Sequence, residues 1–395
     1  MTIVHCSMPH DLCHLSILNP LQHPRVYHKL ARSQARLGYR VQVLAQGQGP
    51  PTDDDLGVRL HPTGRFGRLS LRRWLAPLWL MRLARRQQAR AYVLHSPELL
   101  LLAGWLKRRT RARLLYDVHE DFAANLRHGR HWPAWLRRPL ARLFRAAERY
   151  AVRHWLDGVC YAEACYHNLL RAPERQLVVL ENRFIPPAEA PTPPQLPPQP
   201  YLLYCGTIAT AWGLWESLDL WQAWQQHAPM YLVVAGHTHQ AALLRALQQR
   251  VQASGYAHRF ALLGGSHYLA HTDIVALIRG CYAGLGLYQD LPQIRGKLPT
   301  KFFEFMACER PLLFSPQPAW LARNRETPFG LPWAPGDDLA ALRAQLAQWQ
   351  PPGLAPTAYA WTAQEPRLAS WLHRVMPAPN QPGGESRNDD SRPTR

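Results

Sequence analysis

Two residue pairs in the second half of the chain have the types and spacing needed to bind a phosphorylated ligand. Gly206 and Thr207 stand between a predicted strand and a predicted helix, where free backbone amides and the helix dipole favour anions. Lys301 and Glu304 are three residues apart in a predicted helix, so both side chains lie on one face. Each pair also has a purely structural interpretation: the glycine can allow a tight turn, and the charged pair can form a surface salt bridge.

His119 is the candidate for acid–base chemistry in the first half, because it follows a predicted strand at 113–117. An imidazole there can position a substrate or share a proton. It can equally be an ordinary loop histidine, since the chain has 19 histidines. Asp117 and Glu120 are weaker candidates, because a carboxylate at a strand end often only caps the next helix. No histidines, cysteines and carboxylates have the spacing of metal ligands, so we expect neither a metal nor a cofactor.

Alternating strand and helix patterns predict an α/β fold with two Rossmann-like, doubly wound domains facing each other across a cleft. The first half has predicted strands at 2–6, 38–45, 57–61, 91–95, 113–117, 158–161 and 177–180. After a proline-dense connector, the second half has predicted strands at 201–205, 231–235, 260–263, 283–287 and 311–314. In parallel sheets ligands bind beyond the carboxyl ends of the strands, so both rims should border the cleft.

These patterns divide the chain into five segments. We predict a first domain at 1–185, a linker at 186–200, a second domain at 201–358, a closing helix at 359–377 that crosses back to the first domain, and a disordered tail at 378–395. The linker is assigned from its prolines, and the tail from its proline, glycine, asparagine, serine and charged residues.

Charge and cysteine usage restrict the cellular setting. The chain of 395 residues has a formal net charge of +19, almost wholly from arginine, so its surface should attract phosphates. Charge alone does not distinguish nucleic acid, an anionic membrane, a nucleotide sugar and a phospholipid-linked acceptor. The seven cysteines are scattered without a Cys-x-x-Cys pair, which is typical of reduced thiols in a cytosolic protein. The sequence shows neither a signal peptide nor an apolar run of about 20 residues, so we expect a cytoplasmic protein.

The second half resembles the C-terminal domain of the family-four retaining glycosyltransferases, which have the GT-B fold. The resemblance is carried by the order Tyr-Cys-Gly206-Thr-Ile, Trp-Gly213-Leu, Val-Val-Ala-Gly236, Leu-Leu-Gly264-Gly265, Gly-Leu-Gly-Leu-Tyr288 and Leu-Pro-Thr-Lys301-Phe-Phe-Glu304. The first half matches more loosely through Pro-Arg25-Val-Tyr-His-Lys29, His95-Ser-Pro-Glu98 and Tyr-Asp117-Val-His119-Glu120. Nearly the whole chain is covered, and the C-terminal motifs are the specific part.

The resemblance implies a function and a set of site residues. A sugar would pass from a nucleotide-diphosphate sugar to a hydroxyl of a glycan or lipid-linked glycan, with retention and without a metal, in cell-envelope or exopolysaccharide synthesis. It implies catalytic roles for His119 and Lys301. The implied donor-binding residues are Gly206, Thr207, Gly236, Gly265, Tyr288, Lys301 and Glu304, where the glutamate would hold the ribose hydroxyls and the lysine would offset pyrophosphate charge. The implied acceptor-side residues are Arg25, His95 and Glu120.

Three positions depart from the family pattern. Thr207, Trp212 and Gly296 stand where family members usually have an arginine, a lysine and a glutamate; Arg295, Lys297 and Lys301 are the candidate replacement cations. Two alternatives therefore stay open: a non-catalytic nucleotide-sugar-binding partner of an active transferase, and a sugar-nucleotide epimerase. Nucleic-acid binding is not expected, because the sequence has no helix-turn-helix, zinc-finger or aromatic RNA-binding motif.

A predicted helix at 139–155 has one basic and one apolar face. The basic face comprises Arg138, Arg142, Arg145, Arg149 and Arg153, and the apolar stripe comprises Leu140, Leu143, Phe144, Ala147 and Tyr150. The simpler interpretation packs the stripe in the core and leaves the arginines in solvent. The alternative adds the Trp- and Arg-rich segments 71–82 and 131–138, and brings these helices to the inner face of an anionic membrane.

Overall fold

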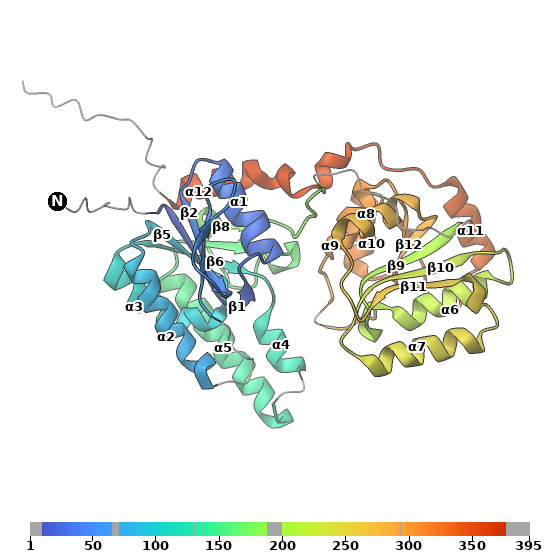
Figure 1. Ribbon diagram of the computed structural model, residues 1–395, viewed down its shortest axis with the longest axis horizontal. Coiled ribbons are helices and arrows are strands. Elements are labelled where there is room, and N and C mark those ends of the chain that lie inside the picture. Colours follow the sequence, from blue (N-terminus) through green and yellow to red (C-terminus); the bar gives the residue numbers. More distant parts are fainter. Residues whose placement is uncertain (1–9, 65–70, 130–131, 188–199, 293, 377–395) are drawn as a thin grey trace, which may run out of the picture.

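The computed structural model describes residues 10–64, 71–129, 132–187, 200–292 and 294–376. The chain forms two α/β domains, each built around its own sheet, and the last helices run from the second domain back to the first (Figure 1). The first sheet has the order β3-β4-β2-β1-β5-β6-β7-β8, and the second has the order β11-β10-β9-β12-β13-β14. The paired strands are parallel except for β3 with β4. The predicted α/β class with two doubly wound domains is therefore confirmed.

The strands divide between the two sheets at the proline-rich connector, most of which falls outside the described residues. The strands of the first sheet are β1 (Leu12–Pro20), β2 (Val41–Gln46), β3 (Thr52–Asp53), β4 (Arg59–Pro62), β5 (Ala91–Leu94), β6 (Arg113–Val118), β7 (Gly158–Tyr161) and β8 (Leu177–Val179). The strands of the second sheet are β9 (Tyr201–Thr207), β10 (Tyr231–His237), β11 (Phe260–Gly265), β12 (Ala283–Gly286), β13 (Leu312–Phe314) and β14 (Gly330–Pro332).

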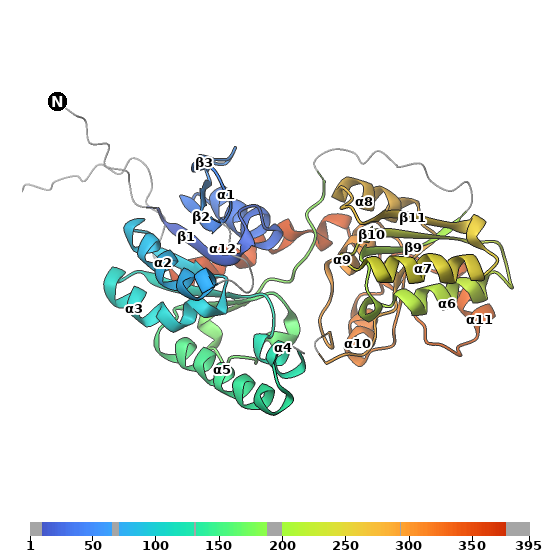
Figure 2. The same ribbon diagram turned by 60° about the horizontal axis from the view of Figure 1, so that its bottom comes forward.

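Helices cover both sheets, as Figures 1 and 2 show. The α-helices are α1 (Arg32–Arg36), α2 (Leu71–Arg86), α3 (Leu100–Thr110), α4 (Phe122–His128), α5 (Ala134–His154), α6 (Leu214–Trp224), α7 (Ala241–Ala253), α8 (His271–Gly280), α9 (Thr300–Ala307), α10 (Pro318–Glu326), α11 (Leu339–Gln348) and α12 (Glu365–Val375). A π-helical segment, η1 (Pro24–Ala31), leads into α1. Short 3-10 turns are η2 (Pro97–Leu99), η3 (Ala164–Tyr166), η4 (Glu174–Gln176), η5 (Thr210–Trp212), η6 (Ala257–Arg259), η7 (Pro356–Tyr359) and η8 (Trp361–Gln364).

The first strand lies later in the chain than the sequence indicated. The predicted strand at 2–6 falls outside the described residues, and β1 instead spans Leu12–Pro20. The polar residues His14 and Ser16 interrupt its apolar pattern although both are fully buried. Sequence periodicity treats buried polar residues as exposed, and this strand was missed for that reason.

The last helix crosses from the second domain to the first. Trp371 of α12 donates from its indole to the carbonyl oxygen of Gln176 at 2.9 Å, and Trp361 donates to Oγ of Ser33 at 2.8 Å. The amide of Gln364 forms two backbone hydrogen bonds with Glu181. These buried contacts attach the end of the chain to the first sheet, where α12 lies in Figure 1.

The carboxyl ends of the first sheet meet the second domain. Glu163, just after β7, accepts a hydrogen bond from the backbone N–H of Leu298 at 3.0 Å. Thr300, the first residue of α9, donates to the carbonyl oxygen of Asn182 at 2.7 Å. A cavity of about 330 Å³ is lined by residues of both domains, including Glu163 and Gly296. The rims of the two sheets therefore border one cleft.

The expected burial of the α5 stripe is wrong. Leu143 is 68% exposed and Tyr150 is 53% exposed. The buried residues of α5 are Ala141, Glu148, Ala151 and Val152. Small side chains on this face allow close packing, and Glu148 is tolerated there because it bonds to the Tyr116 hydroxyl and the Arg145 guanidinium. Leu143 and Tyr150 are therefore not part of the core.

Candidate active site

A pocket of about 520 Å³ opens at the carboxyl ends of β9 and β10, where Gly206, Thr207 and Gly236 line it. Gly206 has φ +98°, which favours glycine. A Cβ on Gly236 would lie 1.7 Å from the carbonyl oxygen of Gly206, its register partner. Neighbouring backbones therefore approach as closely as glycine allows, and the backbone is open toward the pocket.

Lys301 and Glu304 of α9 reach the same end of the sheet from the side. The Lys301 ammonium lies over the rings of Tyr204 and Tyr288, at 5.1 Å and 4.9 Å from the centroids. Glu304 is mostly buried, and its Oε1 lies 2.8 Å from Nε2 of His271. That hydrogen bond raises the pKa of His271 above its ordinary value against the opposing effect of burial. The sequence signal for Lys301 and Glu304 did not indicate His271.

Four predicted donor-binding residues do not line this pocket: Lys301 and Glu304, described above, and Tyr288 and Gly265. Tyr288 is buried, and its ring packs against Trp212 and under Lys301. Gly265 ends β11 with φ +68° and serves the turn that follows. It is the preceding Gly264 whose Cβ would clash, at 2.4 Å from the carbonyl oxygen of Gly236.

The candidate replacement cations separate in space. Arg295 forms an exposed ion pair with Asp290 at 2.7 Å, and Lys297 lies over the ring of Tyr166 in the first domain at 5.9 Å. Gly296 has φ +82° and lies beside Cys165, across the domain boundary. Lys301 is thus the one of the three cations that lies beside the carboxyl end of β9.

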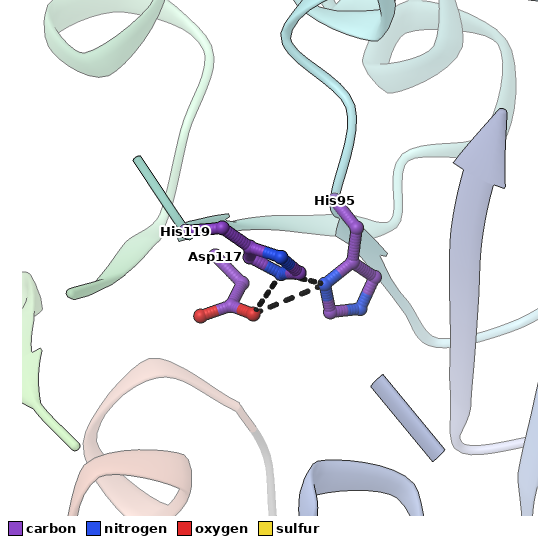
Figure 3. Close-up of side chains that lie close together, drawn as sticks. All are labelled: His95, Asp117 and His119. Carbon is purple, nitrogen blue, oxygen red and sulfur yellow. Dashed lines mark hydrogen bonds and ion pairs between the residues drawn. The ribbon is translucent and has the colours of Figure 1, made fainter. Parts of the chain in front are cut away.

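A buried polar cluster lies at the carboxyl ends of β5 and β6 in the first domain (Figure 3). Oδ2 of Asp117 lies 2.6 Å from Nε2 of His119 and 3.1 Å from Nδ1 of His95. The guanidinium of Arg25 donates to both carboxylate oxygens, at 2.7 to 3.1 Å. Nε2 of His95 in turn lies 2.8 Å from Nδ1 of His14. Arg25 and His95, both distant in sequence from β6, therefore converge with His119 on one carboxylate.

Asp117 is the centre of this cluster and not the helix cap that the sequence suggested. The cap of α4 is Asp121, whose side chain accepts from the backbone N–H of Ala124. Burial acts to raise the pKa of Asp117, but Arg25 and His119 together hold this pKa well below its ordinary value. The ionised carboxylate accepts hydrogen bonds from the rings that surround it, and Nε2 of His95 is hydrogen-bonded to Nδ1 of His14 behind them.

His119 and Glu120 face a cavity of about 670 Å³ that is also lined by His23 and Trp132. The rings of His23 and His119 are stacked, with centroids 5.7 Å apart. The side chain of Arg25, predicted on the acceptor side, is instead fully buried against Asp117, and the His95 side chain is equally buried. The cavity is thus lined by His95, His119 and Glu120, whereas Arg25 does not line it and holds the carboxylate behind them.

Three further residues of this region were missed from the sequence. They are His14 and His23, described above, and Lys29 of η1. Lys29 bonds to Oδ1 of Asn182 at 2.6 Å and interacts electrostatically with Glu304 of the second domain. Burial lowers its pKa to about 7. Lys29 follows Arg25 by four residues in the motif Pro-Arg25-Val-Tyr-His-Lys29. This spacing places the two side chains on one face of a helix, and it was the sequence signal that could have identified Lys29.

His95, Asp117 and His119 also place three ligand atoms close enough to hold a cation. Arg25 contacts the same carboxylate directly, and its fixed positive charge opposes a second cation there. The hydrogen bonds to Asp117 account for the observed geometry without a metal. The expectation of a metal-free site stays a prediction.

The buried histidines give a prediction on pH dependence. Burial lowers the pKa of His14 and of His23 to about 3, and that of His95 to about 4. Because these folded values lie below the ordinary value, the unfolded chain binds more protons in acid than the folded chain does. Each of these histidines therefore lowers the free energy of unfolding as the pH falls below about 6.5. His23→Asn should therefore lose less unfolding free energy between pH 7 and pH 5 than the wild type, by up to about 1.4 kcal/mol per pH unit. Urea unfolding at both pH values measures this difference, and parallel pH dependence would refute the burial argument.

The first domain matches a known family. Residues 24–186 match the glycosyl transferase 4-like domain. No curated protein sequence matches the chain. Residues 24–186 thus match a glycosyltransferase domain family, and the two Rossmann-like domains together have the GT-B fold of solved glycosyltransferases. The resemblance to family-four glycosyltransferases seen in the sequence is thereby confirmed.

Solved structures of the same fold cover nearly the whole chain. Sucrose-phosphate synthase from Thermosynechococcus elongatus has a TM-score of 0.68 at 13% identity, covering 92% of this chain and 99% of that chain. The Anabaena protein HepE, in complex with UDP and glucose, has a TM-score of 0.61 at 14% identity, covering 92% and 100%. A glycosyltransferase from Rickettsia africae has a TM-score of 0.58 at 14% identity, covering 93% of each chain. At these identities the likeness shows the fold.

Proposed function

We propose that this glycosyltransferase moves a sugar from a nucleotide-diphosphate sugar to a hydroxyl of a glycan or lipid-linked glycan, in cell-envelope or exopolysaccharide synthesis. Transfer proceeds with retention of the anomeric configuration and without a metal. The observation that carries the proposal is the glycine-lined pocket at the ends of β9 and β10, with Lys301 and Glu304 beside it. The Anabaena protein of the same fold binds UDP and UDP-glucose, which supports a nucleotide-sugar donor.

On the donor side, backbone groups and two side chains bind different parts of the nucleotide sugar. The backbone at Gly206 and Thr207, where β9 ends, lies against the pyrophosphate, and the missing side chain of Gly206 allows this close approach. The Lys301 ammonium offsets the charge that grows on the diphosphate as it leaves. The Glu304 carboxylate accepts hydrogen bonds from the ribose hydroxyls, for which one of its oxygens is already oriented by His271.

On the acceptor side, His119 borders the cavity in which the acceptor hydroxyl lies. During transfer the bond from the sugar C1 to the diphosphate oxygen breaks and the bond from C1 to the acceptor oxygen forms. The hydroxyl proton passes to the departing diphosphate. Asp117 fixes Nε2 of His119 at 2.6 Å, so the ring keeps one orientation while it positions the sugar and acceptor.

A second function follows from Thr207 and Trp212, which replace the basic residues usual in the family. A chain that binds nucleotide sugars without turnover would serve as the partner of an active transferase. A sugar-nucleotide epimerase shares the architecture and would release a sugar product without any acceptor. Turnover separates these alternatives from glycosyl transfer.

The place of action in this proposal is the cytoplasmic face of a membrane, reached through the Trp- and Arg-rich helices. Among the described residues, no helix has the length and apolar character needed to cross a bilayer. The sugar acceptor is then presented at the lipid surface. The protein would bind there peripherally.

The test is turnover of a nucleotide-sugar panel with extracts of lipid-linked and soluble glycans as acceptors, in excess EDTA and in added Mg²⁺. We expect transfer of one sugar at equal rates in EDTA and in Mg²⁺, because Lys301 and backbone amides stabilise the negative charge of the departing diphosphate. His119→Ala should lower transfer by about a hundredfold, because the ring no longer positions the sugar and acceptor, while nucleotide binding stays. Transfer that stops in EDTA would refute metal independence, and nucleotide binding without transfer would favour the non-catalytic partner.

A further inference from the structure

A second cavity of the first domain is lined mainly by arginines. It measures about 520 Å³ and lies between α4 and α5. Its charged lining residues are Arg127, His128, Arg138, Arg142, Arg145, Arg149 and Asp121. We refer to these residues as the arginine pocket. It is separate from the acceptor cavity, because the two are lined by different side chains of α4.

The charges of the arginine pocket are not balanced within the protein. Arg145 pairs with Asp121 and Glu148. Over the ranges that the structure describes, no carboxylate pairs with Arg127, Arg138 or Arg142. Guanidinium groups around one hollow repel one another, and an anion with several oxygens would accept hydrogen bonds from more than one of them.

The same helix exposes large apolar side chains beside the arginines. Trp135 is 77% exposed, Leu143 is 68% exposed and Tyr150 is 53% exposed. They follow one another at intervals of eight and seven residues, which places them along one face of α5. Arg142 lies about 100° around the helix from Leu143. An apolar row flanked by arginines, with aromatic residues at its ends, is the pattern of a helix that lies in a membrane interface.

We propose that the arginine pocket binds the headgroup phosphate of an anionic phospholipid while the row of Trp135, Leu143 and Tyr150 enters the bilayer interface. The proposal rests on the proposed function, to which it adds the residues and the lipid class of the membrane contact. A soluble anion would account for the arginines but not for the exposed apolar row. A nucleic acid would likewise leave that row in water.

The position of α4 connects this contact to the transfer reaction. Phe122, Asn125 and Leu126 of α4 line the acceptor cavity, and Ala124 and Arg127 line the arginine pocket. One helix, about 10 Å across, therefore separates the lipid phosphate from the acceptor. Docking through α5 brings the acceptor cavity to the depth of lipid headgroups.

The test is sedimentation of the full chain with vesicles of phosphatidylglycerol and phosphatidylcholine, or of phosphatidylcholine alone, at low salt. We expect binding to the anionic vesicles only, weakened about thirtyfold in R138Q/R142Q, because each arginine near such a surface adds a similar increment. The control R245Q/R325Q removes two exposed arginines of the second domain and should bind as the wild type does. L143S should also weaken binding, which a purely electrostatic contact would not show.

Equal loss in the control and the pocket variant, or no loss in either, would overturn the proposal. Tighter binding to RNA than to anionic vesicles would overturn it as well. Stabilisation by nucleotides is measured on the same preparations. A variant that keeps this stabilisation is folded, so nucleotide binding without vesicle binding refutes the arginine pocket alone, and vesicle binding without nucleotide binding refutes the donor site alone.

Discussion

Asp117→Asn is expected to lower the free energy of unfolding by about 3–5 kcal/mol, the range for a buried ion pair that loses one partner. The side chains of Asp117 and Arg25 are 0% and 2% exposed, so the substitution leaves a guanidinium buried without its counter-charge. His95 and His119 also lose the carboxylate that fixes their rings. Glycosyl transfer should fall with the misplacement of His119, even at temperatures where the variant remains folded.

Chemical unfolding monitored by tryptophan fluorescence measures the loss. The matched control is Asp290→Asn, which breaks the exposed ion pair with Arg295 and should leave stability unchanged within error. A change in Asp117→Asn no larger than in this control would mean that the buried cluster does not hold the first domain together. Full transfer activity in the folded variant would separate the cluster from the reaction.

Glu304→Ala is expected to weaken binding of the nucleotide about ten- to a hundredfold, because hydrogen bonds to a charged group contribute about 1.5–3 kcal/mol each. Glu304 stands beside the donor pocket with Oε1 held by His271. Removal of its carboxylate takes away the acceptor for the ribose hydroxyls. The affinity for each nucleotide diphosphate is measured by calorimetry.

Two variants distinguish this role from a structural one. Glu174→Ala removes an exposed glutamate of the first domain and should keep full affinity. His271→Gln removes the imidazole that is hydrogen-bonded to Glu304 but leaves the Glu304 carboxylate in place. This variant should therefore lose much less nucleotide affinity than Glu304→Ala. If the two variants were equally weak, the pair rather than the carboxylate would be the required feature.

The second domain was well predicted from sequence because its signals are local. Its strands are short apolar runs such as β10, and Gly206, Gly236 and Lys301 stand at or near strand or helix ends that the pattern locates directly, with Glu304 three residues after Lys301 in the same helix. What periodicity could not supply was the partner of each side chain. His271, which binds Glu304, lies 33 residues away on another helix.

The first domain was harder to predict because its site depends on distant pairs. Arg25 lies 92 residues from Asp117, so no local pattern favoured an ion pair over a helix cap for Asp117. His14 was missed with its strand, since buried polar residues break the apolar alternation. Two interpretations of the α5 stripe stayed open, core packing and a membrane surface, because an amphipathic pattern does not say which face is buried. Small residues and a paired glutamate occupy the buried face.

Thermal stabilisation of the purified protein by nucleotide diphosphates and nucleotide sugars, without added metal, tests the proposed donor site most directly. A ligand that binds only the folded protein must stabilise it, by about 2.7 kcal/mol at a hundred times its Kd. We expect a clear rise in Tm for one nucleotide and its sugar, and a markedly smaller rise in Glu304→Ala. No rise for any nucleotide would contradict the assignment of the β9–β10 pocket as the donor site.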